Sequence, residues 1–174
     1  MLYQRLMSYF GGVEAIAGAP ESALIRVPRI GPDIAAQIKQ AFRDEAGKKE
    51  LELAQKHHIR IIAYNDAEYP KLLSTIFDSP LVLYVRGQWR ASLWQDGLAL
   101  GVVGSRRASI YGEAMATKLS YAMANYGFGI VSGLARGIDA AAHQGCLRAK
   151  DGYTVAVLGN GLSRIYPPEH KKLA

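Results

Sequence analysis

The sequence predicts an α/β protein in which a parallel-sheet domain follows a small helical domain. In the second part of the chain, short β-branched runs alternate with helical stretches, a pattern typical of βαβ units with right-handed crossovers. In the first part, short apolar-periodic segments are separated by Gly and Pro turn signals, as in short helices. We therefore expect a helical domain with its linker over residues 1–56 and the sheet domain over residues 57–174.

Composition favours a globular protein of the cytoplasm. Of the 174 residues, 49% are hydrophobic and 21% are charged, which argues against extended disorder. The apolar runs are shorter than the roughly 20 residues that a membrane span needs, and Arg5 interrupts any signal-peptide core. Cys146 is the single cysteine, so no internal disulfide can form and a reducing compartment is expected.

The positive charge is concentrated in the second part of the chain. Residues 1–96 contain 12 Lys and Arg against 11 Asp and Glu, whereas residues 97–174 contain 9 against 4. A surplus of this size is also common in proteins that bind no anion, because it aids solubility. Its meaning therefore depends on where the arginines lie.

The helical part contains recognisable boundaries. Pro32 can occupy the first turn of a helix after Gly31, and Ile34, Ile38 and Phe42 then recur on one face. The charged run over residues 44–57 is interpreted as a solvated helix or helical linker. The stretch "VPRIGPDIAAQI" is similar to a helix-hairpin-helix element, but Arg29 replaces its first glycine, so helix packing is the favoured interpretation.

Strands and helices then follow in order. Strands are predicted in "IRIIAY", "PLVLYVRG", "LALGVVG", "GFGIVSG" and "TVAVLGNG", and helices over residues 111–126 and 138–149. In the second of these helices, Cys146 is expected to face the core. The apolar face of the first is expected to contain the following residues: Met115, Leu119, Ala122, Met123 and Tyr126.

Three turns follow the last three predicted strands, and all three contain glycine and arginine. They are "GSRRASIYG", "SGLARGID" and "GNGLSRIYPPEH", and in a parallel sheet they gather at the carboxyl edge. Glycine lets backbone N–H groups approach an oxyanion, and arginine provides a planar fork for phosphate. We therefore expect a phosphate-binding site formed by these residues: Gly104, Ser105, Arg106, Arg107, Ser132, Gly133, Arg136, Gly137, Asn160 and Gly161.

Catalytic and cofactor sites are not indicated. The turns fit neither G-x-G-x-x-G nor the P-loop pattern, so NAD binding and ATP hydrolysis are unsupported, and no cofactor is expected. Asp139 and His143 stand one helical turn apart, but an aspartate near a helix N-terminus and a histidine paired with it explain that spacing. Ser105 and Ser132 have no evident activating base, and no metal site is expected.

The segments "VVGSRRASIYG", "IVSGLARGIDAAAH" and "VAVLGNGLSRIYPPEH", preceded by "YPKLL" and "SPLVLYVRG", resemble the DNA-processing protein A family, DprA or Smf. The resemblance extends from about His57 to the last residue, and the helical start is similar to the family's sterile-alpha-motif-like domain. It implies a Rossmann-like domain that binds single-stranded DNA at a basic pocket, including Gly104, Ser105 and Arg106. It also implies help in loading the RecA recombinase during natural transformation and recombination, and no enzymatic activity.

The resemblance also marks a difference in length. Family members continue beyond "EHKKLA" through further strands, so the chain resembles a C-terminally truncated member. The absent part would include much of the family's dimer surface, and a homodimer is therefore an open expectation.

Two rival functions remain open from the residues. A nucleotide-processing enzyme of a related Rossmann-like family, of the nucleoside monophosphate phosphoribohydrolase type, would need a general acid or base near the edge. Asp139, His143 and Glu169 are the available candidates. A protein that only binds a partner would use the helical part as its contact.

Overall fold

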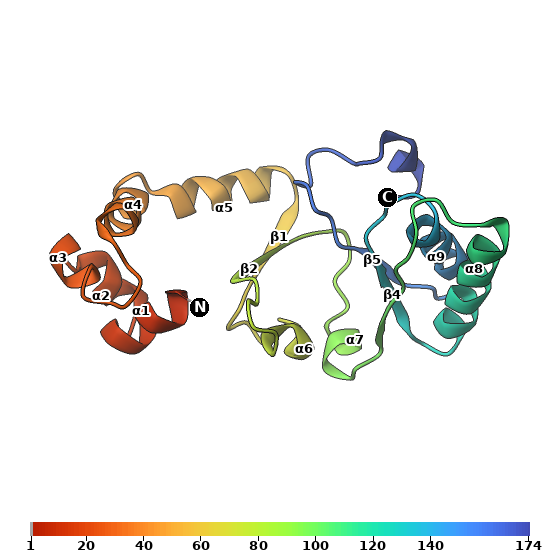
Figure 1. Cartoon of the computed structure of the whole chain (residues 1–174), viewed down its shortest axis with the longest axis horizontal. Coiled ribbons are helices and arrows are strands. Elements are labelled where there is room, and N and C mark those ends of the chain that lie inside the picture. Colours follow the sequence, from red (N-terminus) through yellow and green to blue (C-terminus); the bar gives the residue numbers. More distant parts are fainter. Residues whose placement is uncertain (1) are drawn as a thin grey trace. The chain divides into compact units, whose positions relative to one another are not determined.

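The structure is a computed structural model that describes residues 2–174 and contains two compact units (Figure 1). The first unit includes the chain up to Ala63 together with Thr75–Gly87, and the second includes Tyr64–Ser74 and Gln88–Ala174. The division does not fall at the expected boundary at residue 57, because residues 57–63 and 75–87 belong to the same unit as the N-terminal helices.

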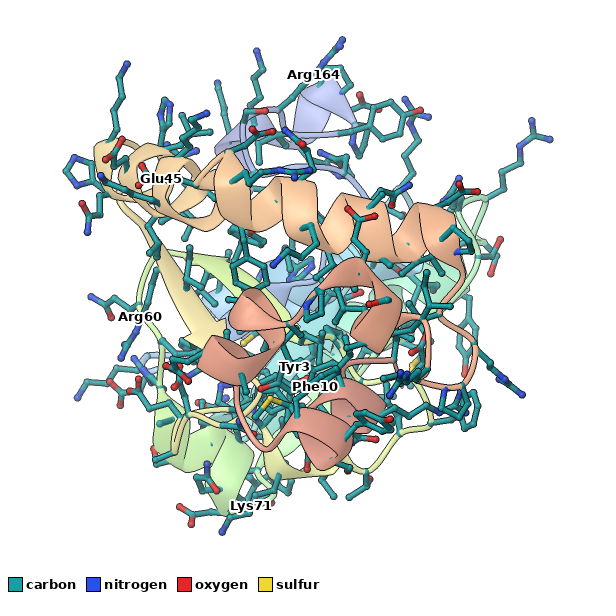
Figure 2. The ribbon with its side chains drawn as sticks, turned by 90° about the vertical axis from the view of Figure 1, so that its left-hand side faces the viewer. Tyr3, Phe10, Glu45, Arg60, Lys71 and Arg164 are labelled. Carbon is teal, nitrogen blue, oxygen red and sulfur yellow. The ribbon has the colours of Figure 1, made fainter. Side chains whose placement is uncertain are left out.

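The first unit begins with helices packed around a small apolar core. The core contains Leu24, Val27 and Ile30, which are almost fully buried, and Phe10 packs against it (Figure 2). Pro32 occupies the first turn of α4 after the N-cap Gly31, as predicted. The helices are α1 (Leu2–Phe10), α2 (Val13–Gly18), α3 (Glu21–Leu24), α4 (Pro32–Arg43) and α5 (Ala46–Lys56).

Two strands complete the first unit. β1 (Ile59–Ala63) pairs antiparallel with β2 (Val82–Arg86), and Ile61 lies opposite Tyr84. Both strands were predicted from their β-branched and aromatic residues. β1 and β2 form a two-stranded sheet, and the parallel strands of the second unit form a separate sheet.

The second unit contains the parallel sheet, whose strand order is β3-β4-β5. In the register, Gly101 lies opposite Val131, and Val131 lies opposite Val155. This arrangement confirms the predicted α/β class and its crossovers. The elements of this unit are α6 (Lys71–Ser74), α7 (Ala91–Gln95), β3 (Ala99–Gly101), α8 (Ile110–Asn125), β4 (Gly129–Ser132), α9 (Ile138–Leu147), β5 (Thr154–Ala156) and the 3-10 helix η1 (Pro168–Lys172).

Helices α8 and α9 lie on the same side of this sheet (Figure 1). Ile130 of β4 is fully buried against Ala142 and Cys146 of α9, which confirms the expected orientation of Cys146. Burial raises the pKa of the Cys146 thiol. The thiol is therefore a packed core group in this unit.

The buried face of α8 differs from the predicted one. Leu119 is 54% exposed and Tyr126 is 78% exposed, whereas Ala116, Ser120 and Ala124 are buried. The prediction was therefore wrong for Leu119 and Tyr126, whereas Met123 of the predicted face packs against the core. The contact with α9 selects small residues rather than large apolar ones. A Cβ atom on Gly145 of α9 would lie 2.2 Å from the carbonyl oxygen of Thr117, so the two backbones approach too closely for longer side chains.

A substitution at this contact tests the close approach. Gly145→Ala should lower the free energy of unfolding by about 1–3 kcal/mol, because α8 and α9 must separate to admit the methyl group. Gly112→Ala is the matched control, since its Cβ would make only ordinary van der Waals contacts at the start of α8. Chemical denaturation should show a loss for the first variant and little change for the second; equal stabilities would contradict this packing.

Candidate functional site

The three arginine-bearing turns lie where the parallel strands end. The first turn, residues 104–109, connects β3 to α8, and the second, residues 133–137, connects β4 to α9. The third, residues 157–164, follows β5. Because β3, β4 and β5 are parallel, all three turns lie at the same edge of the sheet.

The first turn is held directly against the start of α9. Gly137 has φ 71°, and a Cβ atom there would lie 2.3 Å from the Ser105 carbonyl oxygen. The same oxygen accepts a hydrogen bond from the N–H of Ile138 at 3.2 Å. A Cβ on Gly104 would lie 2.7 Å from Ile138 Cγ1. Only glycine at these two positions allows the turns to fit together.

Arg106 and Arg107 extend from this fixed turn. Both residues are exposed, and neither makes an ion pair with another residue in the described part of the chain. The backbone N–H of Arg107 donates to Ser105 Oγ at 3.0 Å, so the hydroxyl orders the turn. The N-cap Ser109 accepts from the N–H of Gly112 and starts α8. Two guanidinium groups therefore remain available for an anion.

The second turn is stabilised from inside by Asp139. This carboxylate is only 7% exposed, and its Oδ2 accepts hydrogen bonds from the N–H groups of Gly133 at 3.1 Å and Ala135 at 3.4 Å. A Cβ on Gly133 would lie 2.8 Å from the same oxygen. Asp139 therefore does more than complement the helix dipole, and the N–H of Gly133 points to it instead of to solvent.

Ser132 also points inward. The residue is 3% exposed, and its hydroxyl donates to the carbonyl oxygen of Val102 at 2.7 Å. This bond holds the end of β4 to the segment after β3. The expected role of Ser132 as a phosphate ligand does not fit this geometry, because the hydroxyl is both buried and engaged.

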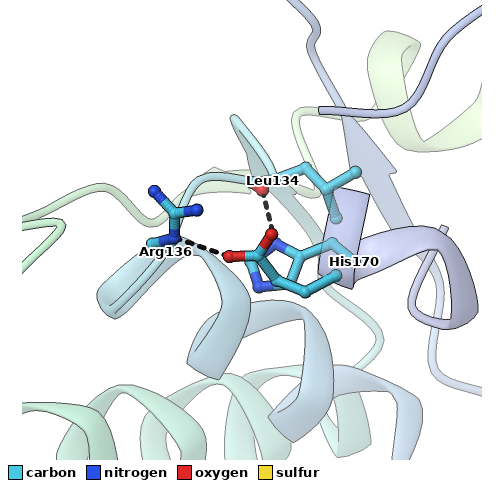
Figure 3. Close-up of polar contacts among 4 residues, drawn as sticks. Leu134, Arg136 and His170 are labelled. Carbon is cyan, nitrogen blue, oxygen red and sulfur yellow. Dashed lines mark hydrogen bonds and ion pairs between the residues drawn. The ribbon is translucent and has the colours of Figure 1, made fainter. Parts of the chain in front are cut away.

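Arg136 lies in an ion pair that the sequence did not indicate. Its Nε donates to Glu169 Oε1 at 2.6 Å, and the bond lowers the pKa of Glu169 and raises that of Arg136 (Figure 3). Both side chains are about half exposed. The terminal nitrogens of the guanidinium remain able to donate, so an incoming phosphate would share Arg136 with this carboxylate.

A neighbouring histidine fixes η1 to the second turn. His170 Nδ1 lies 2.8 Å from the carbonyl oxygen of Leu134, which can only accept, so this nitrogen carries the proton (Figure 3). Leu134 has φ 58°, the positive value that we would have expected at a glycine. Sequence reasoning missed His170 as a structural contact, because no spacing rule links residues 36 positions apart.

The third turn is organised by Asn160. Its side-chain nitrogen donates to the carbonyl oxygens of Gly161 and Arg164. Arg164 itself is exposed (Figure 2). Asn160 and Gly161 thus lie at the predicted edge, with the amide engaged in the turn and the arginine side chain at the surface.

His143 of α9 lies in a buried network with β4 and β5. Thr154 Oγ1 donates to the Ile130 carbonyl at 2.8 Å, so its lone pair accepts from His143 Nδ1 at 2.6 Å. This bond places the proton of the neutral ring on Nδ1 and leaves Nε2 buried without a partner among the described residues. Burial lowers the pKa of His143, against a smaller opposing effect of Asp139.

Residues 2–174 show neither a metal cluster nor a membrane-spanning helix. No cluster of three or more His, Cys, Asp or Glu side chains within that range could hold a metal ion. None of the helices described there combines the length and apolarity that crossing a membrane requires. The expectation of no metal or cofactor remains a prediction.

Comparison with known families gives a match that covers the whole second unit and nearly all of the two strands of the first. The family described as DNA recombination-mediator protein A matches residues 60–174. Protein Smf of Synechocystis sp. is 37% identical over 174 residues, which is 99% of this chain and 44% of that protein. Protein Smf of Escherichia coli is 43% identical over 70% of this chain and 31% of its own length. The chain therefore spans less than half the length of these curated relatives.

Solved structures of related proteins share the fold. The X-ray structure of DNA processing protein A from Streptococcus pneumoniae has a TM-score of 0.74 and 28% identity, covering 99% of this chain and 57% of that one. DNA processing protein A from Helicobacter pylori, described with a unique single-stranded DNA binding mode, has a TM-score of 0.55 and 28% identity. That match covers 67% of this chain and 50% of the other.

The buried histidine predicts a pH dependence of stability. Because the pKa of folded His143 is below its unfolded value of about 6.5, the unfolded state binds more protons in that window, and stability should fall as pH decreases below about 6.5. His143→Asn keeps a donor toward Thr154 but cannot titrate, so its melting temperature should fall less between about pH 7.5 and 5. The exposed control His57→Asn should keep the parental slope; a parental slope in His143→Asn would contradict the assignment.

Proposed function

The chain belongs to the DNA recombination-mediator protein A family, and we propose that it binds single-stranded DNA along the carboxyl edge of its parallel sheet. The observation that carries this proposal is the fixed first turn, which presents Arg106 and Arg107 exposed and without ion-pair partners in the described part of the chain. Arginine in such a position provides two parallel donors for phosphate oxygens.

The relatives support the same class of ligand. The Helicobacter pylori structure is described by its single-stranded DNA binding mode, and curated relatives from Bacillus subtilis and Streptococcus pneumoniae are named DNA processing protein DprA. In this chain, the contacts would be to phosphates, which carry no base information. We therefore expect sequence-independent binding.

Arg136 would add a contact of a different kind. Its Nε already donates to Glu169, so a phosphate would meet the outer guanidinium nitrogens beside a negative charge. We expect this arginine to contribute less to affinity than Arg106, because the carboxylate already offsets part of its charge. Arg164 would complete the edge from the third turn.

The proposal extends to partners of the whole protein. We expect the bound strand to be protected and presented to the RecA recombinase during natural transformation and recombination, as the sequence resemblance implies. A homodimer remains part of this proposal, and so does a cytoplasmic location. The curated relatives from Synechocystis and Escherichia coli are more than twice as long as this chain.

The contacts favour binding over the nucleotide-processing alternative. Asp139 is buried and accepts two backbone hydrogen bonds, and His143 is 1% exposed with its Nδ1 engaged by Thr154. Glu169 is paired with Arg136. A general acid or base must reach the substrate, and each of these groups is committed to holding the fold.

The first test removes the exposed guanidinium group of Arg106. Arg106→Ala should weaken binding of a short oligothymidylate by about 10- to 100-fold, because a hydrogen bond to a charged group contributes about 1.5–3 kcal/mol. Arg106→Lys should restore part of the affinity, since lysine keeps the charge but not the fork. Fluorescence anisotropy at constant salt measures both, with the exposed Lys150→Ala as control. Parental affinity in the alanine variant would place the site elsewhere.

The salt dependence counts the phosphate contacts. For three to four contacts, the slope of log affinity against log salt should be about −2 to −3, at about −0.7 per phosphate on a single strand. Arg136→Ala should reduce the magnitude by at most about 0.7 and weaken all base sequences equally. Titrations of homopolymers and mixed oligonucleotides supply both readouts. A slope near zero, or a strong base preference, would rule out phosphate recognition at this edge.

A further inference from the structure

A groove of about 830 Å³ runs along the surface between α8 and α9. One end is formed by Arg136, in the second turn of the proposed DNA edge, and by His170 of η1. The other end is formed by Lys118 and Tyr121 of α8 and by Arg148 at the end of α9. The groove therefore begins at the edge and leads away from it along the helices.

The length of the groove exceeds that of a single phosphate contact. Arg136 precedes α9 and Arg148 follows its last residue, and the ten residues of this helix span about 15 Å at 1.5 Å per residue. Between them the groove is lined by small residues, including Ala140 and Ala141. The close packing of α8 on α9 that requires Gly145 keeps this floor free of long side chains.

The far end combines positive charge with an aromatic face. Lys118 and Arg148 are exposed, and neither makes an ion pair with another described residue. Tyr121 is 45% exposed, so its ring is accessible from the groove. Glu113 is the one acidic residue of the lining in the described structure, and it lies nearer the edge, at the start of α8. Cations beside an accessible aromatic ring are the combination that binds single strands.

We propose that single-stranded DNA continues from the carboxyl edge into the α8–α9 groove, where Lys118 and Arg148 contact phosphates and Tyr121 stacks on a base. This second subsite rests on the proposed function, because the groove opens at Arg136. Single-stranded nucleic acid is the occupant that the chemistry favours over a peptide, because Lys118 and Arg148 make no ion pair with another described residue and Tyr121 offers a ring for stacking. It adds length to the bound strand without adding sequence specificity.

The test compares two lengths of strand. Oligothymidylates of ~4 and ~16 nucleotides bracket the site sizes of single-strand binders. Lys118→Ala combined with Arg148→Ala should weaken binding of the longer oligonucleotide about tenfold and leave the shorter one unchanged. The matched control is Lys71→Ala combined with Lys150→Ala, which removes the same charge from exposed positions outside the groove. Thermal melting confirms that each protein is folded.

The aromatic contact has its own pair of variants. Tyr121→Phe keeps the ring and should bind the longer oligonucleotide as the parent does, whereas Tyr121→Leu removes stacking and should weaken it about tenfold. A role limited to a hydrogen bond from the tyrosine hydroxyl would weaken both variants equally, because neither side chain has a hydroxyl group. Equal binding by the phenylalanine and leucine variants would overturn the stacking role.

The outcomes separate this inference from the proposed function. If Arg106→Ala weakens both lengths while the groove variant matches its charge control, the second subsite is refuted and the edge site stands. If the groove variant weakens both lengths equally, the groove is not a continuation of the edge, and the inference again fails. If the parent binds neither oligonucleotide, the proposed function and the inference fall together.

Discussion

The second unit depends on the close packing of α9 against α8 and against the turn that precedes α8. At the start of α9, Gly137 leaves no room for a side chain above the Ser105 carbonyl, and Gly104 leaves none beside Ile138. Farther along, Gly145 lies against the backbone of Thr117. Contacts of this kind hold two backbones in one relative position, because any added atom must move both.

This constraint separates the backbone of the turns from their side chains. The N–H groups of Gly133 and Ala135 donate to the buried Asp139, and the Ser132 hydroxyl donates to Val102. The backbone of the second turn is therefore satisfied internally and contributes rigidity more than binding. The exposed arginines supply the charge, and a rigid base lowers the entropy that they lose when an anion binds. Glu169 pairs with Arg136, so the first two turns combine this paired arginine with Arg106 and Arg107, which make no ion pair with another described residue.

The small residues that permit this packing also shape the outer surface. Because α8 meets α9 through Ala116, Ser120 and Ala124, its larger side chains Leu119 and Tyr126 lie at the surface. The groove between the helices follows from the same small residues, since its floor contains alanines and its rim contains longer polar side chains. The contact that positions the turns thus also creates a path that leads away from them.

The sequence by itself determined the parallel sheet, its crossover helices and the edge where the arginines gather, because strand and helix periods and turn residues are local properties. It also placed Pro32 and Gly31 at the start of α4. Tertiary structure alone decided which polar groups are engaged, since the partners of Ser132, Arg136 and His170 lie on segments far apart in the chain. It also decided the buried face of α8, because a helix with apolar residues on several sides buries the side that its neighbour can approach most closely.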